Sequence, residues 1–81
     1  MKAQQRTATS LKSGLGAAIR RARFILRISQ GELAFRAGLH RTYVSDLERG
    51  ARNPSVESIE KRAAALQISV AKLFEQAAGK A

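Results

Sequence analysis

The chain of 81 residues has no cysteine and no tryptophan, and it contains one proline, one histidine and one tyrosine. Without cysteine, neither a disulfide framework nor a thiolate zinc site can supplement the core. The single histidine, His40, offers no partners for a metal site or a hydrolase triad, so we expect no metal, no cofactor and no small-molecule ligand. One small domain, stabilised by aliphatic side chains, fits this length.

Long hydrophobic runs are also missing. No apolar stretch approaches the roughly 18 residues of a membrane span, and residues 1–10 lack the apolar segment of a secretory signal. We interpret residues 1–10 as a flexible basic tail and residues 11–76 as the folded domain, with residues 77–81 frayed. Together with the lack of cysteine, these absences predict a soluble, cytoplasmic protein.

Acidic residues are scarce: six Asp and Glu face 15 Lys and Arg, for a net charge of +9. Eleven basic and three acidic residues lie in positions 1–52, and four basic and three acidic residues lie in positions 53–81. Solubility alone needs no such asymmetry. A basic half is instead typical of a protein that binds a polyanion. Nucleic acid is the favoured partner, and an anionic membrane is the second choice.

The spacing of apolar residues predicts an all-α fold of five short helices around one core. The first helix spans about residues 11–27, and its inward stripe consists of Leu15, Ile19, Ala22 and Leu26. Ser29 and Glu32 form a capping box that begins the second helix. Gly38 ends this helix, because glycine adopts a positive φ at little cost.

The remaining helices have equally local signals. A third helix begins at His40 or Arg41 and ends near Gly50. A loop with Pro54 precedes a fourth helix, over about residues 56–66. Ser69 then caps a short fifth helix whose apolar residues are Val70, Leu73 and Phe74.

The second and third helices, joined by a tight turn with Gly38, have the pattern of a helix-turn-helix unit. Ala34 and Ala37 provide small side chains where the two helices meet, and Leu39 follows the turn. Val44 and Leu47 point inward, so the polar face of the third helix is left for another molecule.

The stretch SQGELAFRAGLHRTYVSDLERGARNPS, residues 29–55, resembles the lambda-repressor-like, Cro-type (xenobiotic-response-element) DNA-binding domains. Within that family it most resembles small standalone regulators such as restriction–modification controller proteins. The resemblance extends from Leu15 to Phe74 and implies five helices, a homodimer, and a third helix inserted in the major groove. Gly31 departs from the family pattern, which often has Glu or another helix former there.

The first turns of such a recognition helix face base edges. We therefore expect base readout by Arg41, Thr42, Ser45 and Asp46. Arg41 can donate two hydrogen bonds to guanine, while Thr42 can contact either a thymine methyl or a phosphate. Asp46 can accept from cytosine N4, or it can hold Arg41 or Arg49 in place, and we favour the second role.

We also expect contacts with the DNA backbone. The residues concerned are Gln30, Tyr43, Arg49, Arg52 and Asn53. The resemblance implies these contacts for all of them except Tyr43, whose hydroxyl could bond phosphate. Gln30 corresponds to a family glutamine that grips phosphate or supports the reading helix, and packing on its own protein is the alternative for Tyr43. Arg23 and Glu48 correspond to a recurrent structural ion pair.

Apolar residues outside the predicted core can mark interfaces. Near the fifth helix we expect dimer contacts from Ile68, Val70, Leu73 and Phe74, with packing inside the monomer as the alternative. Phe24, Ile25 and Phe35 fit the core stripes poorly and can be exposed.

The sequence thus predicts a sequence-specific double-stranded DNA-binding transcriptional regulator acting as a homodimer. A restriction–modification controller and a phage-type repressor are equally economical versions. An antitoxin-like module that binds a partner protein is the main alternative, followed by a basic protein on a membrane surface. An enzyme is the weakest interpretation, since paired carboxylates, a phosphate loop and an activated nucleophile are all missing.

Overall fold

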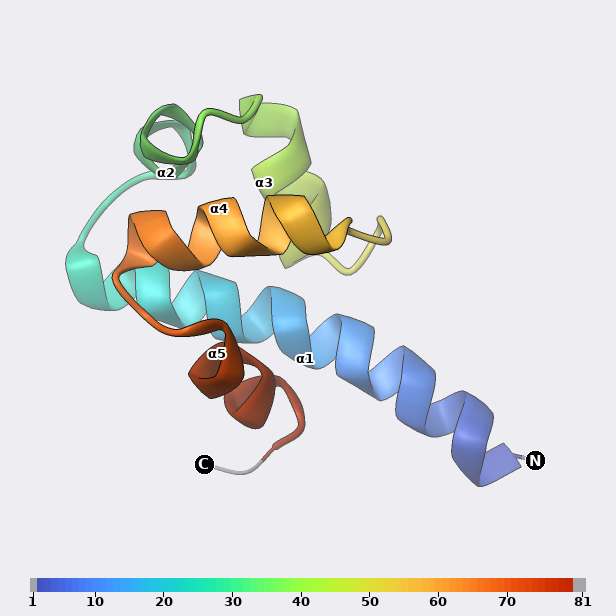
Figure 1. Ribbon diagram of the computed structural model, residues 1–81. Helices are drawn as coiled ribbons and strands as arrows, with labels where there is room; N and C mark the ends of the chain where they lie inside the picture. The colour runs from blue at the N-terminus through green and yellow to red at the C-terminus, as the bar shows by residue number, and fades with distance from the viewer. Residues whose placement is uncertain (1, 80–81) are drawn as a thin grey trace.

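The computed structural model describes residues 2–79, with side chains from residue 11 onward. It contains five α-helices and confirms the all-α prediction (Figure 1). Their bounds are α1 Lys2–Leu26, α2 Gln30–Ala37, α3 Arg41–Glu48, α4 Val56–Leu66 and α5 Val70–Ala77. No helix among the described residues combines the length and apolar character needed to cross a membrane.

Serine side chains begin three of the helices. Ser29, Ser55 and Ser69 each accept a hydrogen bond from the backbone amide three residues later, at 3.0, 3.1 and 3.0 Å. Such bonds satisfy amides that have no partner within the helix. In place of the reciprocal half of the predicted capping box, the Glu32 carboxylate accepts from Arg36 at 2.8 Å.

Left-handed residues end α2 and α4. Gly38 has φ 69°, and the amide of Leu39 reaches back to the carbonyl of Ala34 at 2.9 Å. This is the predicted glycine stop. Gln67, with φ 60°, ends α4 in the same conformation, although its side chain disfavours it.

The first helix begins earlier than the sequence predicted. We expected a start near Leu11, but α1 runs back to Lys2. Ala, Gln, Arg and Lys are good helix formers, and no glycine or proline interrupts residues 2–12. The expected mobility of this basic segment stays a prediction, and its side chains, together with residues 80–81 of the expected frayed end, lie outside the described part.

The core lies between α1 and the other helices, and α4 crosses its middle (Figure 1). Its fully buried members come from four helices: Ile19, Leu33, Val44, Leu47 and Leu73. In Figure 1 the α2–α3 pair lies on one side of α4 and α5 on the other. One face of the domain is therefore formed by α2 and α3.

Two glycines allow α1 to approach its neighbours closely. A Cβ on Gly14 would collide with the backbone carbonyl of Ala77, at the end of α5. A Cβ on Gly16 would collide with the carbonyl of Leu47 and lie 2.9 Å from that of Glu48. Gly16 thus sets how closely the end of α3 rests on α1.

Candidate nucleic-acid interface

The two faces of α3 differ as the sequence predicted. Val44 and Leu47 are buried, with 0% and 1% exposure. Arg41 and Thr42 are exposed in the first turn, and Ser45 is half-buried one turn later. The outward face therefore presents a guanidinium and two hydroxyl groups in positions open to another molecule.

His40 begins α3. Its Nδ1 accepts a hydrogen bond from the amide of Thr42 at 3.1 Å, so the imidazole caps the helix. This bond gives the single histidine a structural role at the N-terminus of the exposed segment.

The C-terminal end of α3 is fastened to α1 by Arg23 and Glu48. Arg23 Nε and Nη2 donate to the two carboxylate oxygens of Glu48 at 2.7 and 2.9 Å. The side chains are only 9% and 4% exposed. The hydrogen bond to Glu48 raises the pKa of Arg23, against the effect of burial. The predicted ion pair is present and buried.

Gln30 joins this pair from the start of α2. Its Nε2 donates to Glu48 Oε1 at 3.1 Å. The family glutamine either grips phosphate or supports the recognition helix, and in this structure Gln30 supports α3 through Glu48. Contact between Gln30 and phosphate stays a prediction.

Asp46 holds two arginines. Its Oδ1 accepts from Arg49 Nη2 at 2.6 Å, and its Oδ2 accepts from Arg52 Nη2 at 2.9 Å and from Nε at 3.3 Å. These hydrogen bonds, from Arg52 first and then Arg49, lower the pKa of Asp46. Asp46 therefore holds arginine side chains, as we favoured from the sequence. The two arginines are Arg49, as expected, and Arg52 instead of Arg41.

Tyr43 is 45% exposed, and the Arg52 guanidinium lies over its ring, 4.6 Å from the centroid. Such stacking is a cation–π contact. We name Tyr43, Asp46, Arg49 and Arg52 the Asp46 cluster. Asn53 follows it, exposed in the loop before α4.

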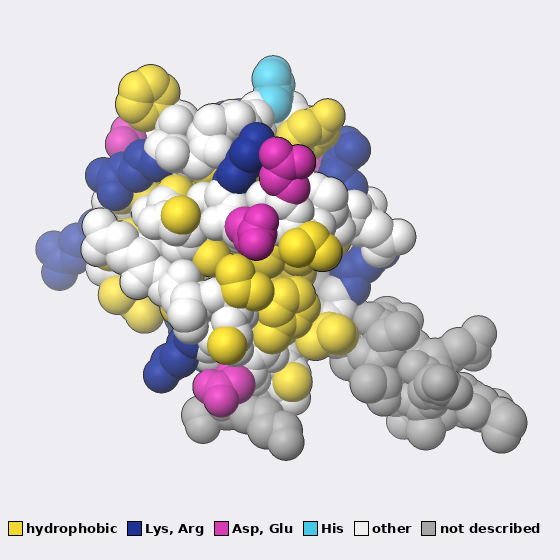
Figure 2. Space-filling view, in the orientation of Figure 1, with side chains coloured by type: hydrophobic (Ala, Val, Ile, Leu, Met, Phe, Trp, Pro, Cys, Tyr) yellow, Lys and Arg dark blue, Asp and Glu magenta, His cyan; other side chains and the backbone are white. Residues whose placement is uncertain are grey.

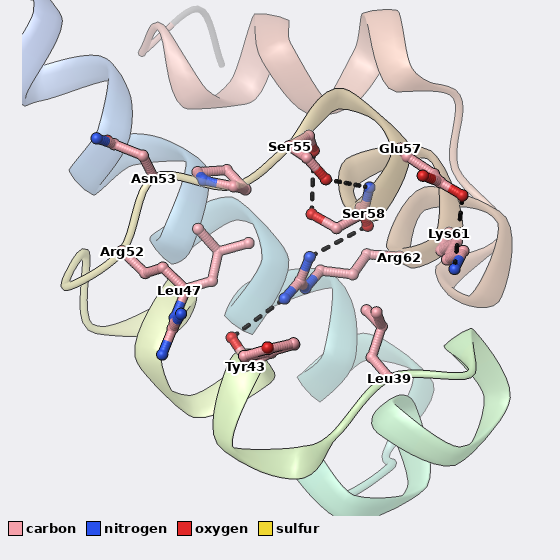
Figure 3. A pocket seen from close by; sticks show the side chains of 11 residues that line it. Leu39, Tyr43, Leu47, Arg52, Asn53, Ser55, Glu57, Ser58, Lys61 and Arg62 are labelled. Carbon is pink, nitrogen blue, oxygen red and sulfur yellow. Dashed lines mark hydrogen bonds and ion pairs between the residues drawn. The ribbon is translucent and has the colours of Figure 1, made fainter.

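The sequence interpretation missed Arg62, which is 2% exposed inside α4. It donates to the carbonyl of Tyr43 in α3 and to that of Ser58, both at 3.1 Å (Figure 3). Burial lowers its pKa, while the charge of Glu48 opposes that change. Its position three residues after Ile59, on the apolar stripe of α4, was the available signal. Arg62 ties α4 to the middle of α3.

Arg20 was also missed. It lies on the exposed face of α1 and lines a surface hollow with Gln30 and Arg49. The guanidinium is 5.2 Å from the centroid of the Phe24 ring. Basic groups from α1 and from the end of α3 thus meet beside the start of α2.

This arrangement matches a known family. Residues 19–73 match the family described as helix-turn-helix. The chain belongs to the helix-turn-helix family. The protein is therefore a DNA-binding transcriptional regulator, as the sequence predicted.

Similar proteins include two control proteins. C.SmaI of Serratia marcescens is 41% identical over 64 residues, which are 79% of this chain and 76% of the relative. C.BamHI of Bacillus amyloliquefaciens is 50% identical over 48 residues, 59% of each protein, so the match spans less than two thirds of that relative. The crystal structure of the restriction–modification controller protein C.AhdI from Aeromonas hydrophila is 43% identical, with a TM-score of 0.74 over 75% of this chain and 92% of the other.

The helix-turn-helix domain carries apolar groups at its surface. Of the four candidate dimer residues, Ile68, Val70 and Phe74 are half-buried, but Leu73 is 0% exposed. Leu73 packs in the core of its own monomer, which corrects its place among surface contacts. Figure 2 shows hydrophobic side chains gathered over α4 and α5, with Lys and Arg mainly around the margin of the view.

The other suspected apolar residues are exposed as predicted. Phe24, Ile25 and Phe35 are 55%, 73% and 81% exposed. They lie at the end of α1 and on the outer face of α2.

Proposed function

We propose that this helix-turn-helix protein reads a specific double-stranded DNA operator with the outward face of α3. The observation that supports this most is the exposure of Arg41 and Thr42 in the first turn of α3, where a recognition helix meets base edges. Arg41 would donate two hydrogen bonds to guanine, and Thr42 and Ser45 would contact bases or phosphates. A protein with this function would act where the operator is, in the cytoplasm.

The DNA backbone would lie along the basic groups beside α3. Arg20, Gln30 and Arg49 share one hollow, and helix N-terminal amides at Gln30 also favour an anion. Tyr43, Arg52 and Asn53 would contact phosphate on the other side of the reading face. Such contacts position a protein on the duplex without selecting its sequence.

We further propose a homodimer. The half-buried Ile68, Val70 and Phe74, next to the hydrophobic surface over α4 and α5 (Figure 2), support a contact between two copies there. A compact dimer would bind half-sites about one helical turn, roughly 10 bp, apart.

The likeness to control proteins supports the role of a restriction–modification controller. Such a protein would regulate transcription through occupancy of its DNA sites. At one occupancy it would contact RNA polymerase and activate, and at another it would block polymerase and repress. Selection of binding sites from random duplex DNA tests these points together. A two-fold-related motif is expected, and recovery of no motif would refute sequence-specific binding.

Two substitutions separate reading from positioning. Arg41→Ala should weaken binding to the selected operator by about 1–3 kcal/mol and change binding to random duplex much less. Arg20→Ala should weaken both DNAs alike and reduce the salt slope by about one. Equal losses on both DNAs for Arg41→Ala would make Arg41 a backbone contact instead.

Exposure of Phe35 supports a second candidate function, the binding of a partner protein by α2. A stoichiometric partner should then co-purify with the wild-type chain from its host and be lost with Phe35→Ser. DNA binding by that variant should be unchanged. Co-purification that survives Phe35→Ser would contradict this function.

A further inference from the structure

In the Asp46 cluster, the carboxylate of Asp46 binds the guanidinium groups of Arg49 and Arg52. One carboxylate oxygen holds Arg49 and the other holds Arg52 through two nitrogens, at 2.6 to 3.3 Å. A phosphate with two free oxygens would be held in the same way. The Asp46 carboxylate therefore uses the same donors of Arg49 and Arg52 that a backbone phosphate would need.

Asp46 is poorly placed for reading a base. Both of its oxygens already accept hydrogen bonds from arginines, and its side chain is only 16% exposed. It nevertheless lies four residues after Thr42 and three before Arg49, hence on the same face of α3. A phosphate that approaches this face must displace the carboxylate from the arginines or share them with it.

The arginines are restrained but accessible. The Arg49 and Arg52 side chains are 66% and 47% exposed. Arg52 is also held on its other side by the Tyr43 ring. Both guanidinium groups can therefore exchange Asp46 for another anion without unfolding any helix.

We propose that Asp46 is an internal competitor, which competes with DNA phosphates for Arg49 and Arg52 and so lowers the affinity of the protein for any duplex. This inference rests on the proposed function. On the operator, contacts with the bases hold α3 in the major groove and bring phosphates close enough to displace the Asp46 carboxylate from the arginines. On other sequences α3 enters the major groove less deeply, and Arg49 and Arg52 remain hydrogen-bonded to Asp46.

A strongly basic protein has a physical need for such a device. With a net charge of +9, this chain is attracted to any duplex. A carboxylate that engages two arginines lowers general attraction while it leaves the base-reading residues unchanged.

The test is the salt dependence of binding to random duplex by wild type and by Asp46→Asn. Each additional phosphate contact steepens the slope by about 0.9. Between 200 and 50 mM salt, the variant should therefore gain about 3.5-fold more affinity than wild type if one arginine is released and about 12-fold more if both are. Affinity for the selected operator should rise at least as much but without a change of slope, because the arginines already contact phosphate there and the substitution removes only the cost of displacing Asp46.

Two controls assign the effect to the arginines. Glu75→Gln makes the same change in charge on α5, which packs on α1 and α4, and it should leave the slope unchanged. In an Arg49→Ala, Arg52→Ala background, Asp46→Asn should also leave it unchanged. A circular dichroism melt checks that each variant is folded.

Three outcomes would overturn the proposal: an unchanged slope for Asp46→Asn, a change no larger than that of Glu75→Gln, or a change that persists without the two arginines. Weaker binding of Asp46→Asn to random duplex would overturn it as well, because Asp46 would then be positioning the arginines for phosphate. Failure of the proposed function is a separate result, since wild type would then show no preferred operator in the selection experiment.

Discussion

Replacing Glu48 with glutamine removes the charge that faces Arg23 while keeping the size of the side chain. The pair is 9% and 4% exposed, so the Arg23 guanidinium would stay buried without its counter-charge. Breaking a buried pair in this way costs about 3–5 kcal/mol. Small domains have a total stability of about 5–15 kcal/mol, so Glu48→Gln should remove much of it. The expected fall in Tm is about 12–40 °C.

Glu32→Gln is a matched control. Glu32 also pairs with an arginine, Arg36, at 2.8 Å, but the side chains are 44% and 41% exposed. Water screens this pair. The ion pair and the favourable position of the Glu32 charge near the N-terminus of α2 should together contribute at most about 1 kcal/mol. The two glutamine variants therefore differ mainly in burial of the lost charge.

Denaturation by urea, followed by circular dichroism, measures both variants. Losses that are equal within error would refute the argument from burial. A third variant, Arg23→Met with Glu48→Leu, tests its cause, because an apolar pair of similar size leaves no unpaired charge and should recover most of the stability. If the double variant is as unstable as Glu48→Gln, the loss comes from packing instead.

Two further predictions concern glycine and pH. Gly16→Ala should cost about 1–3 kcal/mol through overpacking against the end of α3. Gly31→Ala should instead stabilise the fold by up to about 1 kcal/mol, because its Cβ would lie at ordinary contact distances of 3.8 Å from the Ser29 hydroxyl oxygen and 3.9 Å from the Arg41 Cδ. Equal urea midpoints for the two variants would contradict this. Asp46 has a lowered pKa in the folded chain, so its contribution is present above the unfolded pKa of about 3.9 and is lost as the pH falls through the folded value. The urea midpoints of wild type and Asp46→Asn should therefore differ by a constant amount from pH 8 to 5 and converge only below about pH 4; convergence between pH 7 and 5 would be the opposite result.

Local chemistry made most of the helix boundaries predictable. Ser29 and Ser69 begin helices through bonds that span three residues, and Gly38 ends one through its own φ. These signals depend only on neighbours in sequence. The start of α1 was harder to predict, since residues 2–12 contain no glycine or proline. Thr7, Thr9 and Ser10 are of the type that caps a helix, but they lie inside α1.

The parts of the site that were missed depend on distant neighbours. Arg62 lies on the apolar stripe of α4, but an arginine is rarely fully buried, and its acceptor on Tyr43 belongs to another helix. The bond between Asp46 and Arg52 crosses the end of α3, where helical spacing no longer holds. Leu73 was placed on α5 correctly, yet only the packing shows which side of that helix is covered.

These distant contacts explain how an eight-residue helix can be held in place for the proposed reading of DNA. An isolated helix of this length is marginal in water, so its neighbours must hold α3. Arg62 binds the carbonyl of Tyr43 from α4, and Arg23 binds Glu48 from α1. All of these contacts lie on the inner side or at the C-terminal end, while Arg41 and Thr42 are outside them. If α3 reads DNA as proposed, substitutions at those two positions should therefore change the preferred operator without destabilising the helix.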